Sequence, residues 1–162
     1  MALNAYLTLT GVKTGAIQGS VIEKGREGSI MVIAVSHEII SPRDPASGLP
    51  TGKRMHKPLV ITKELDKSTP LLYRVLVTNE TLSRWDLRYW RALPTGAQQQ
   101  HFTIRLTNAS IASIAQRMPN NRDPELMKLE TYEEIAFTYQ RIEWTWVDGG
   151  ITASDDWEST VA

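Results

Sequence analysis

Residues 55–76, MHKPLVITKELDKSTPLLYRVL, form the stretch in which a β-strand pattern passes directly into a helix. The apolar, β-branched run at residues 59–65 predicts a strand, and residues 66–70 (DKSTP) are of the types that begin helices. A Ser68 or Thr69 hydroxyl can accept an unpaired amide of the first turn, and Pro70 suits that turn because it lacks an N–H. The sequence therefore predicts one short α-helix over about residues 69–79. Its apolar stripe should pack against a sheet. The stripe consists of Leu71, Leu72, Val75 and Leu76.

The chain on either side of this helix is predicted to be mainly β. Apolar and polar residues alternate, as in half-buried strands, over residues 6–10, 82–93, 102–107 and 129–147. The second and third of these segments flank a turn and predict a hairpin. About eight strands with a single helix are typical of a compact two-sheet β-barrel or sandwich. We expect one such domain over residues 1–162.

Four segments have a less regular pattern. A short strand is expected near Val21 and Ile22, between glycines. Residues 30–40 are almost continuously apolar and predict one strand that is buried on both faces for part of its length. Residues 109–115 should continue the preceding strand with a bulge or a bend. In residues 129–147 the apolar phase flips between positions 140 and 141. The flip predicts either a one-residue bulge or a strand that changes the face it buries, as at a barrel corner.

Residues 41–57 form the longest segment of loop composition, rich in proline and glycine. A loop of this length in a compact domain is usually functional or disordered. The segment is also basic, with Arg43, Lys53, Arg54, His56 and Lys57 against Asp44. Two interpretations remain open: a solvated loop, or an arm that reaches a neighbouring subunit.

Composition excludes several classes of function. The chain has 18 Lys and Arg residues against 18 Asp and Glu residues, so its net charge is zero. It therefore lacks the excess of positive charge that would attract nucleic acid or anionic membranes over a broad surface. It has no cysteine, which excludes disulfides, thiolate catalysis and cysteine-ligated metals. The N-terminal residues alternate without a basic region, so no signal peptide is expected, and no run reaches transmembrane length. We expect a protein made soluble in the cytoplasm, which leaves the cell, if it does, without a cleaved signal.

The sequence contains no constellation typical of an enzyme. His37, His56 and His101 lie on separate segments, and none pairs with another histidine or a carboxylate at ligand spacing. Residues 48–54 resemble a phosphate-binding loop only superficially, because the spacing is one residue short and an arginine replaces the metal-binding hydroxyl. Asp155 and Asp156 beside Trp157 are expected to lie in a turn with a packed ring, not in a cation or sugar site. We predict no catalytic residue, no cofactor and no metal.

One patch supports a rival hypothesis, a small β-barrel that binds single-stranded nucleic acid. Basic and aromatic side chains interleave along one predicted strand, as they do in such proteins. They are Arg84, Trp85, Arg88, Tyr89, Trp90 and Arg91. Three observations oppose it. The net charge is zero, Asp86 interrupts the basic face, and two of the rings lie on the face opposite two of the arginines.

Motifs distributed along the chain resemble the haemolysin-coregulated protein (Hcp) family, the inner-tube subunit of bacterial type VI secretion systems. The most specific is KRMHKPLVITK at residues 53–63, followed by DKSTP at 66–70. The others are AYLTLTGV (5–12), IRLTNASI (104–111), EEIAFTY (133–139), IEW (142–144) and DDW (155–157). They follow one another over nearly the whole chain. The basic loop at 41–57 is a departure, since this loop varies within the family.

The resemblance implies a structural protein without catalysis. Six subunits would form a ring, and rings would stack head to tail into a hollow tube. A contractile sheath would propel the tube, a spike protein would sit at its tip, and effectors would travel in the lumen. The tube would be secreted without a signal peptide, and neither nucleic acid nor membrane insertion is implied.

A tube needs two heterologous interfaces, one lateral and one axial. We expect the lateral one to bury about 800 Å² or more per partner. We expect the loop to make the axial one, through Arg43, Asp44, Lys53, Arg54, His56 and Lys57. By position, Ser36 matches a lumen-facing site in the family.

Overall fold

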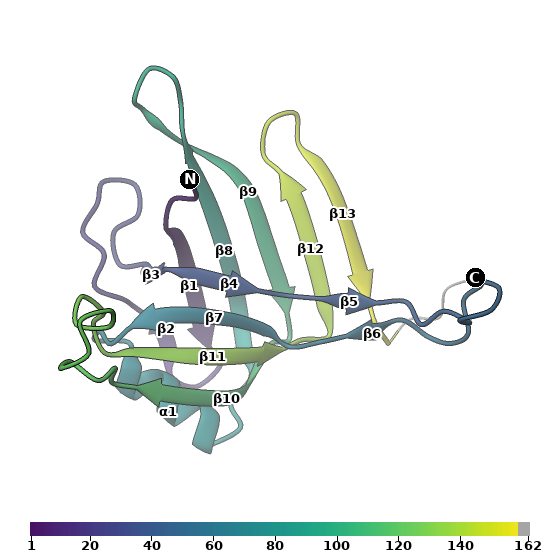
Figure 1. Cartoon of the computed structure of the whole chain (residues 1–162), viewed down its shortest axis with the longest axis horizontal. Coiled ribbons are helices and arrows are strands. Elements are labelled where there is room, and N and C mark those ends of the chain that lie inside the picture. The colour runs from purple at the N-terminus through teal and green to yellow at the C-terminus, as the bar shows by residue number, and fades with distance from the viewer. Residues whose placement is uncertain (159–162) are drawn as a thin grey trace.

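Two antiparallel β-sheets pack face to face in the computed structural model, which describes residues 1–158 (Figure 1). The larger sheet has the order β13-β12-β9-β8-β1-β2, with β3 also paired to β1. Its strands are β1 (Ala5–Gly11), β2 (Gly15–Ile17), β3 (Ile30–Val32), β8 (Leu82–Ala92), β9 (Gln98–Thr107), β12 (Arg141–Trp146) and β13 (Ile151–Asp156). The smaller sheet has the order β10-β11-β7-β4. Its strands are β4 (Ala34–Ser36), β7 (Leu59–Glu64), β10 (Ser110–Arg117) and β11 (Tyr132–Thr138).

The predicted mainly β fold with one helix is confirmed, in its sandwich form. The two sheets do not close into a barrel. The predicted hairpin is also confirmed, because β8 pairs with β9 from Asp86 to Ala92. A third, two-stranded pair, β5 (Ile39–Ile40) with β6 (Met55–His56), extends from the sandwich.

Side chains from both sheets meet in one buried core. Trp85 of β8 and Phe137 of β11 are fully buried, and their ring centroids lie 5.3 Å apart across the two sheets. Each strand contributes alternate residues, which is why Leu7 and Leu9 of β1 are buried together. This alternation is the physical basis on which the strands were predicted.

Apart from the crossing through α1, the chain passes from one sheet to the other at three corners, and there the predictions need correction. Residues 30–40 are not one doubly buried strand, because β3 pairs in the larger sheet, β4 pairs in the smaller one, and Ile33 between them is exposed. Residues 109–115 do not continue β9. Asn108 takes a positive φ of 50°, and β10 begins in the other sheet. A bulge in β10 near Ile111 and Ser113 is confirmed.

The third corner resolves the phase flip within residues 129–147. The segment forms two strands, β11 in the smaller sheet and β12 in the larger one, so the corner alternative is confirmed and the bulge alternative is wrong. Crossing between the sheets lets residues of opposite phase reach the same core, and both Phe137 and Ile142 are buried. The prediction of a strand near Val21 and Ile22 is also wrong. That part of the chain is a loop, and Gly15–Ile17 pairs with β1 instead.

The predicted helix is α1 (Thr69–Val77), with Leu72 and Val75 buried against the sheet. Ser68 is its N-cap. The predicted side-chain cap is wrong, because the Ser68 hydroxyl accepts no amide of the first turn. The Ser68 hydroxyl donates to Asp66 Oδ1, and Asp66 Oδ1 also accepts the Ser68 N–H at 2.9 Å. This helix is not long and apolar enough to cross a membrane, and it is the only helix within residues 1–158.

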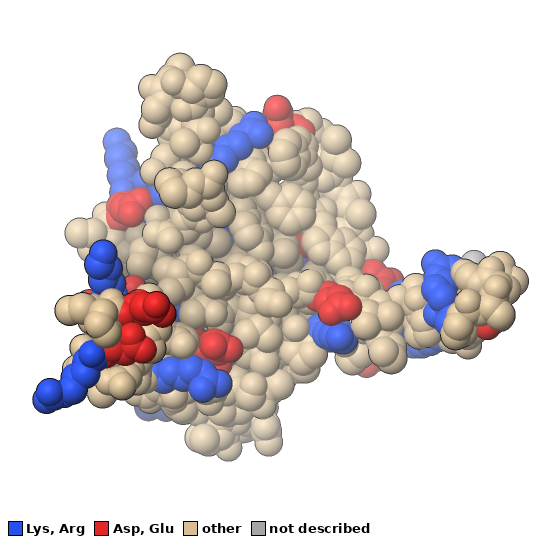
Figure 2. All heavy atoms as spheres, in the orientation of Figure 1, with Lys and Arg blue, Asp and Glu red and all other residues tan. Residues whose placement is uncertain are grey.

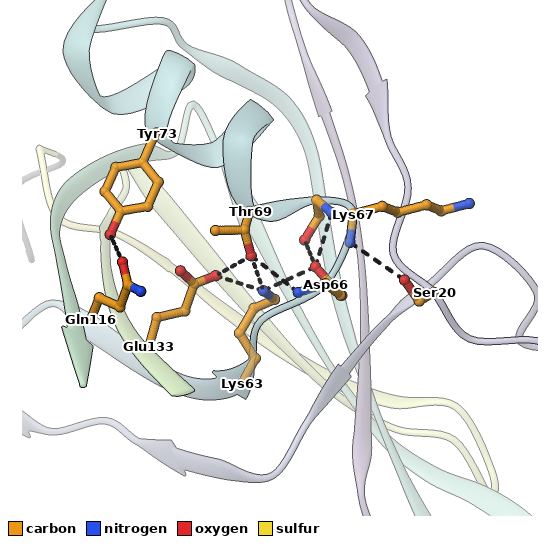
Figure 3. Close-up of polar contacts among 9 residues, drawn as sticks. Ser20, Lys63, Asp66, Lys67, Thr69, Tyr73, Gln116 and Glu133 are labelled. Carbon is orange, nitrogen blue, oxygen red and sulfur yellow. Dashed lines mark hydrogen bonds and ion pairs between the residues drawn. The ribbon is translucent and has the colours of Figure 1, made fainter. Parts of the chain in front are cut away.

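A buried ion pair joins β7, the start of α1 and β11 (Figure 3). Lys63 Nζ lies 2.6 Å from Glu133 Oε1, and both side chains are fully buried. The Thr69 hydroxyl donates to the same Glu133 oxygen at 3.1 Å, and Asp66 Oδ1 lies 3.1 Å from the ammonium group. Its neighbour Glu134 faces the opposite side of the sheet, where it pairs with Arg117.

Candidate functional site

The basic loop is an ordered hairpin that projects from one end of the sandwich (Figures 1 and 2). At its base β5 pairs with β6, and further out Arg43 forms a β-bridge with Pro50. The Thr51 N–H donates to the Pro42 carbonyl at 3.0 Å. Asp44 closes the distal turn, because its carboxylate accepts the Ala46 N–H at 3.0 Å and the Ser47 hydroxyl at 2.7 Å. We call residues 41–57 the arm. These backbone pairings hold its two halves together without a hydrophobic core.

A chain of polar side chains ties the base of the arm to the sandwich. Arg54 Nη2 donates to Asp155 Oδ1 at 2.8 Å, and its Nε donates to Oδ2 of the same carboxylate. His56 Nε2 lies 2.7 Å from Asp155 Oδ2, and His56 Nδ1 lies 2.7 Å from the Tyr139 hydroxyl. His37 Nε2 contacts that hydroxyl at 2.8 Å. We call these five residues the latch, because they connect the arm to β13 and to the corner after β11.

The latch alters the ionisation of its members. The hydrogen bond from Arg54 lowers the pKa of Asp155, and the bond from His56 acts in the same direction. Burial lowers the pKa of His37, and the charge of His56 adds to this effect. Burial raises the pKa of Tyr139, as does the negative charge of Asp155. At neutral pH the latch therefore contains an ionised Asp155, a protonated phenol and a neutral His37.

The structure separates the six predicted arm residues into two groups. Arg43 and Asp44 lie in the distal part of the arm, and the exposed Lys53 lies between that part and the base. At its base, Arg54 and His56 contact Asp155, and Lys57 forms an exposed ion pair of 3.2 Å with Glu38. Ser36 lies elsewhere, on the edge strand β4, with its side chain exposed.

Sequence reasoning missed the latch, and two of its expectations are wrong. His56 does pair with a carboxylate, and His37 and His56 meet at one phenol. Asp155 and Asp156 lie at the end of strand β13, not in a turn, although Trp157 does pack against His56 with ring centroids 5.6 Å apart. The Tyr139 and Asp155 partners of His56 lie 83 and 99 residues away along the chain. No local spacing could have indicated them.

Part of the patch behind the nucleic-acid hypothesis is taken up by contacts within the chain. Arg84 and Arg105 donate to the two oxygens of the buried Asp86 at 2.9 and 2.7 Å. Trp85 is fully buried in the core, so its ring is not available to stack on a base. Within residues 1–158 no group of three or more His, Asp or Glu residues is placed to hold a metal ion.

Comparisons with known proteins agree with this geometry. The family model described as "Type VI secretion system effector, Hcp" matches residues 6–146. A "Major exported protein" of Pseudomonas aeruginosa is 40% identical over 171 residues, covering 100% of this chain and 99% of the relative.

Solved structures of Hcp proteins have the same fold. One described as "Crystal structure of Hcp protein" has a TM-score of 0.90 at 30% identity and covers 97% of this chain and 99% of its own. The "Secreted protein Hcp3" of Pseudomonas aeruginosa has a TM-score of 0.79 at 32% identity, covering 96% and 99% respectively. Because the family model spans most of the chain and a relative is 40% identical over its whole length, this chain belongs to the Hcp family of type VI secretion proteins.

Proposed function

We propose that this chain is the structural subunit of a type VI secretion tube. Copies assemble into six-membered rings, and the rings stack head to tail into a hollow tube. The tube carries effectors in its lumen, bears a spike protein at its tip and is driven by the contractile sheath. The subunit reaches the exterior with the tube, without a cleaved signal peptide, and performs no catalysis.

The observation that carries this proposal is the ordered, projecting arm. A hairpin held by its own backbone pairs and latched at its base has little to pack against in a single copy. Within residues 1–158, strands β4, β10 and β13 each end a sheet with one unpaired side. Such edges are sites for contact with another chain. An arm and sheet edges on different faces supply the two heterologous interfaces that a tube requires.

Electron microscopy of the purified protein tests the proposal. Six-fold rings with a central hole, joined into tubes at high protein concentration, are expected. A protein that remains a monomer or a symmetric dimer at every concentration would contradict it.

Shortening the arm tests its role in stacking. Replacing residues 43–50 by Asn-Gly joins Pro42 to Thr51 through a two-residue hairpin turn and leaves the latch in place. Rings should persist while stacking is lost. Tubes formed by the shortened protein would show that the arm does not make the axial contact.

We also infer that Ser36 faces the lumen. Its exposed side chain on the edge strand β4 supports this inference. A photoreactive group at position 36 should crosslink to cargo in assembled tubes, whereas one at Val77, which is exposed on α1, should not. Equal crosslinking from both positions would contradict the assignment.

A further inference from the structure

We propose that the arm of one copy seats in a hollow at the opposite end of a copy in the adjoining ring. This inference rests on the proposed tube and adds to it the surface that receives the arm. The hollow has a volume of about 290 Å³ and is lined by residues 20–23, Met31 and residues 64–66. Ser20 and Asp66 come from the two segments that bound it, and the Lys67 N–H joins these segments by donating to the Ser20 hydroxyl at 3.4 Å (Figure 3).

The lining of the hollow is acidic. Glu23, Glu64 and Asp66 contribute carboxylates, and no lysine or arginine lines it among the residues that the structure describes. Glu23 is paired with Arg26, which lies outside the lining, at 2.8 Å. Lys63 lies beneath the hollow, fully buried and paired with Glu133 and Asp66. Glu64 makes no ion pair with any residue in 1–158, so no cation of the same copy is paired with its carboxylate.

The projecting part of the arm carries the complementary charge. Arg43 and Lys53 form no ion pair with any described residue, and Figure 2 shows the cations of the arm standing clear of the sandwich. Asp44 is the carboxylate beside them, held by Ala46 and Ser47 within the turn, and it offsets only one of the two cations, so the projecting part keeps a net positive charge. A basic arm and an acidic hollow attract one another, and mismatched surfaces of like charge repel.

Each surface also exposes a large apolar side chain. Leu49 on the arm is 65% exposed, and Ile22 at the rim of the hollow is 90% exposed. Val21, Met31 and Leu65 line the hollow around Ile22 and supply apolar surface against which Leu49 can pack. Burying these groups together removes apolar area from water in both copies.

The positions of the two surfaces require a head-to-tail contact. Strand β7 begins beside the base of the arm and ends at Glu64 in the lining of the hollow, so one strand links donor and acceptor. The arm lies at one end of the longest axis of the molecule, and the end of β7 lies toward the other (Figure 1). When a surface at one end binds a different surface at the other end, each copy is left with one free donor and one free acceptor. Such contacts repeat without limit, as a tube requires.

Paired cysteines test the contact directly, because the natural chain has none. The variant with both Leu49→Cys and Ile22→Cys should form intermolecular disulfides on mild oxidation of the assembled protein. A ladder of dimers, trimers and higher species is expected on a non-reducing gel. The matched control combines Leu49→Cys with Val77→Cys, since Val77 is 75% exposed on α1, away from the lining residues. It should give no ladder, because a disulfide needs Cα atoms within about 7 Å.

A charge exchange tests the electrostatic part. Glu64→Lys alone and Arg43→Glu alone should each abolish stacking while six-fold rings persist, and the double variant should restore it. The crosslink result distinguishes this inference from the proposed function. Stacked tubes in the microscope without the Leu49–Ile22 ladder would overturn the hollow as acceptor and leave the tube intact. A chain that never forms rings would overturn the tube itself, and the proposed contact with it.

Discussion

His56 and Asp155 are joined by a 2.7 Å contact between the imidazole Nε2 and the carboxylate Oδ2, although 99 residues separate them in the chain. Through this contact the base of the arm is fixed to the last strand of the larger sheet. The same carboxylate binds Arg54 through both of its oxygens. One aspartate therefore holds two residues of the arm base that lie two positions apart, and the direction in which the arm projects depends on it.

Replacing Asp155 by asparagine should loosen the arm without unfolding the sandwich. The variant keeps the size of the side chain but loses the charge-assisted bonds to Arg54 and His56, which are worth more than neutral ones. We expect a loss of about 1–2 kcal/mol in the free energy of unfolding. We also expect faster amide exchange at residues 39–57 than in the core strands, measured by hydrogen–deuterium exchange. Asp148→Asn is the matched control, because Asp148 lies in an exposed turn. Unchanged exchange in the arm of Asp155→Asn would show that the latch does not order it.

Acid should weaken the same latch. The pKa of Asp155 is lowered in the folded protein, chiefly by the hydrogen bond from Arg54. A lowered folded pKa means that the stabilisation is complete above the unfolded pKa of about 3.9 and is lost as the pH falls through the folded pKa. The free energy of unfolding from urea titrations should therefore fall between about pH 5 and pH 2, and it should fall less steeply in Asp155→Asn. Parallel pH profiles for the variant and the parent would contradict this assignment, while Asp148→Asn should follow the parent.

Local sequence patterns predicted the elements of this fold better than their connections. The strand and helix of residues 55–76 follow from alternation and helix-start residues, which act over a few positions. The corners were missed or left open because the choice of sheet depends on long-range pairing. Ile33 could not be read as a crossing point from its neighbours alone. The latch escaped prediction for the same reason. Its residues are ordinary in their local context and become a unit only when the arm folds against β13.

The buried Lys63–Glu133 pair should be costly to break on one side only. Lys63→Met removes the cation and leaves Glu133 buried with an uncompensated charge, so we expect a loss of about 3–5 kcal/mol in the free energy of unfolding. Adding Glu133→Leu should recover most of this loss, because two apolar side chains of similar size can replace a buried pair. Urea unfolding of both single variants and the double variant completes a double-mutant cycle. The exposed Arg117–Glu134 pair is the control, and Glu134→Gln should cost about 1 kcal/mol or less. A double variant as unstable as Lys63→Met would contradict this account.

Gly11 should not tolerate a methyl group, because a Cβ at this position would lie 2.0 Å from Glu80 Oε2. That carboxylate oxygen accepts the Thr14 N–H at 2.9 Å and the Lys13 N–H at 3.2 Å, and so it holds the β1–β2 turn against the end of α1. In Gly11→Ala, Glu80 must move away and both amides lose their acceptor. Overpacking of this kind costs about 1–3 kcal/mol, which corresponds to a decrease in Tm of about 2–10 °C for a chain of this size. Gly52→Ala is the control, since no atom lies within 4 Å of a Cβ there and the φ angle of Gly52 is not positive. Equal Tm values for the two alanine variants would show that Glu80 does not constrain Gly11.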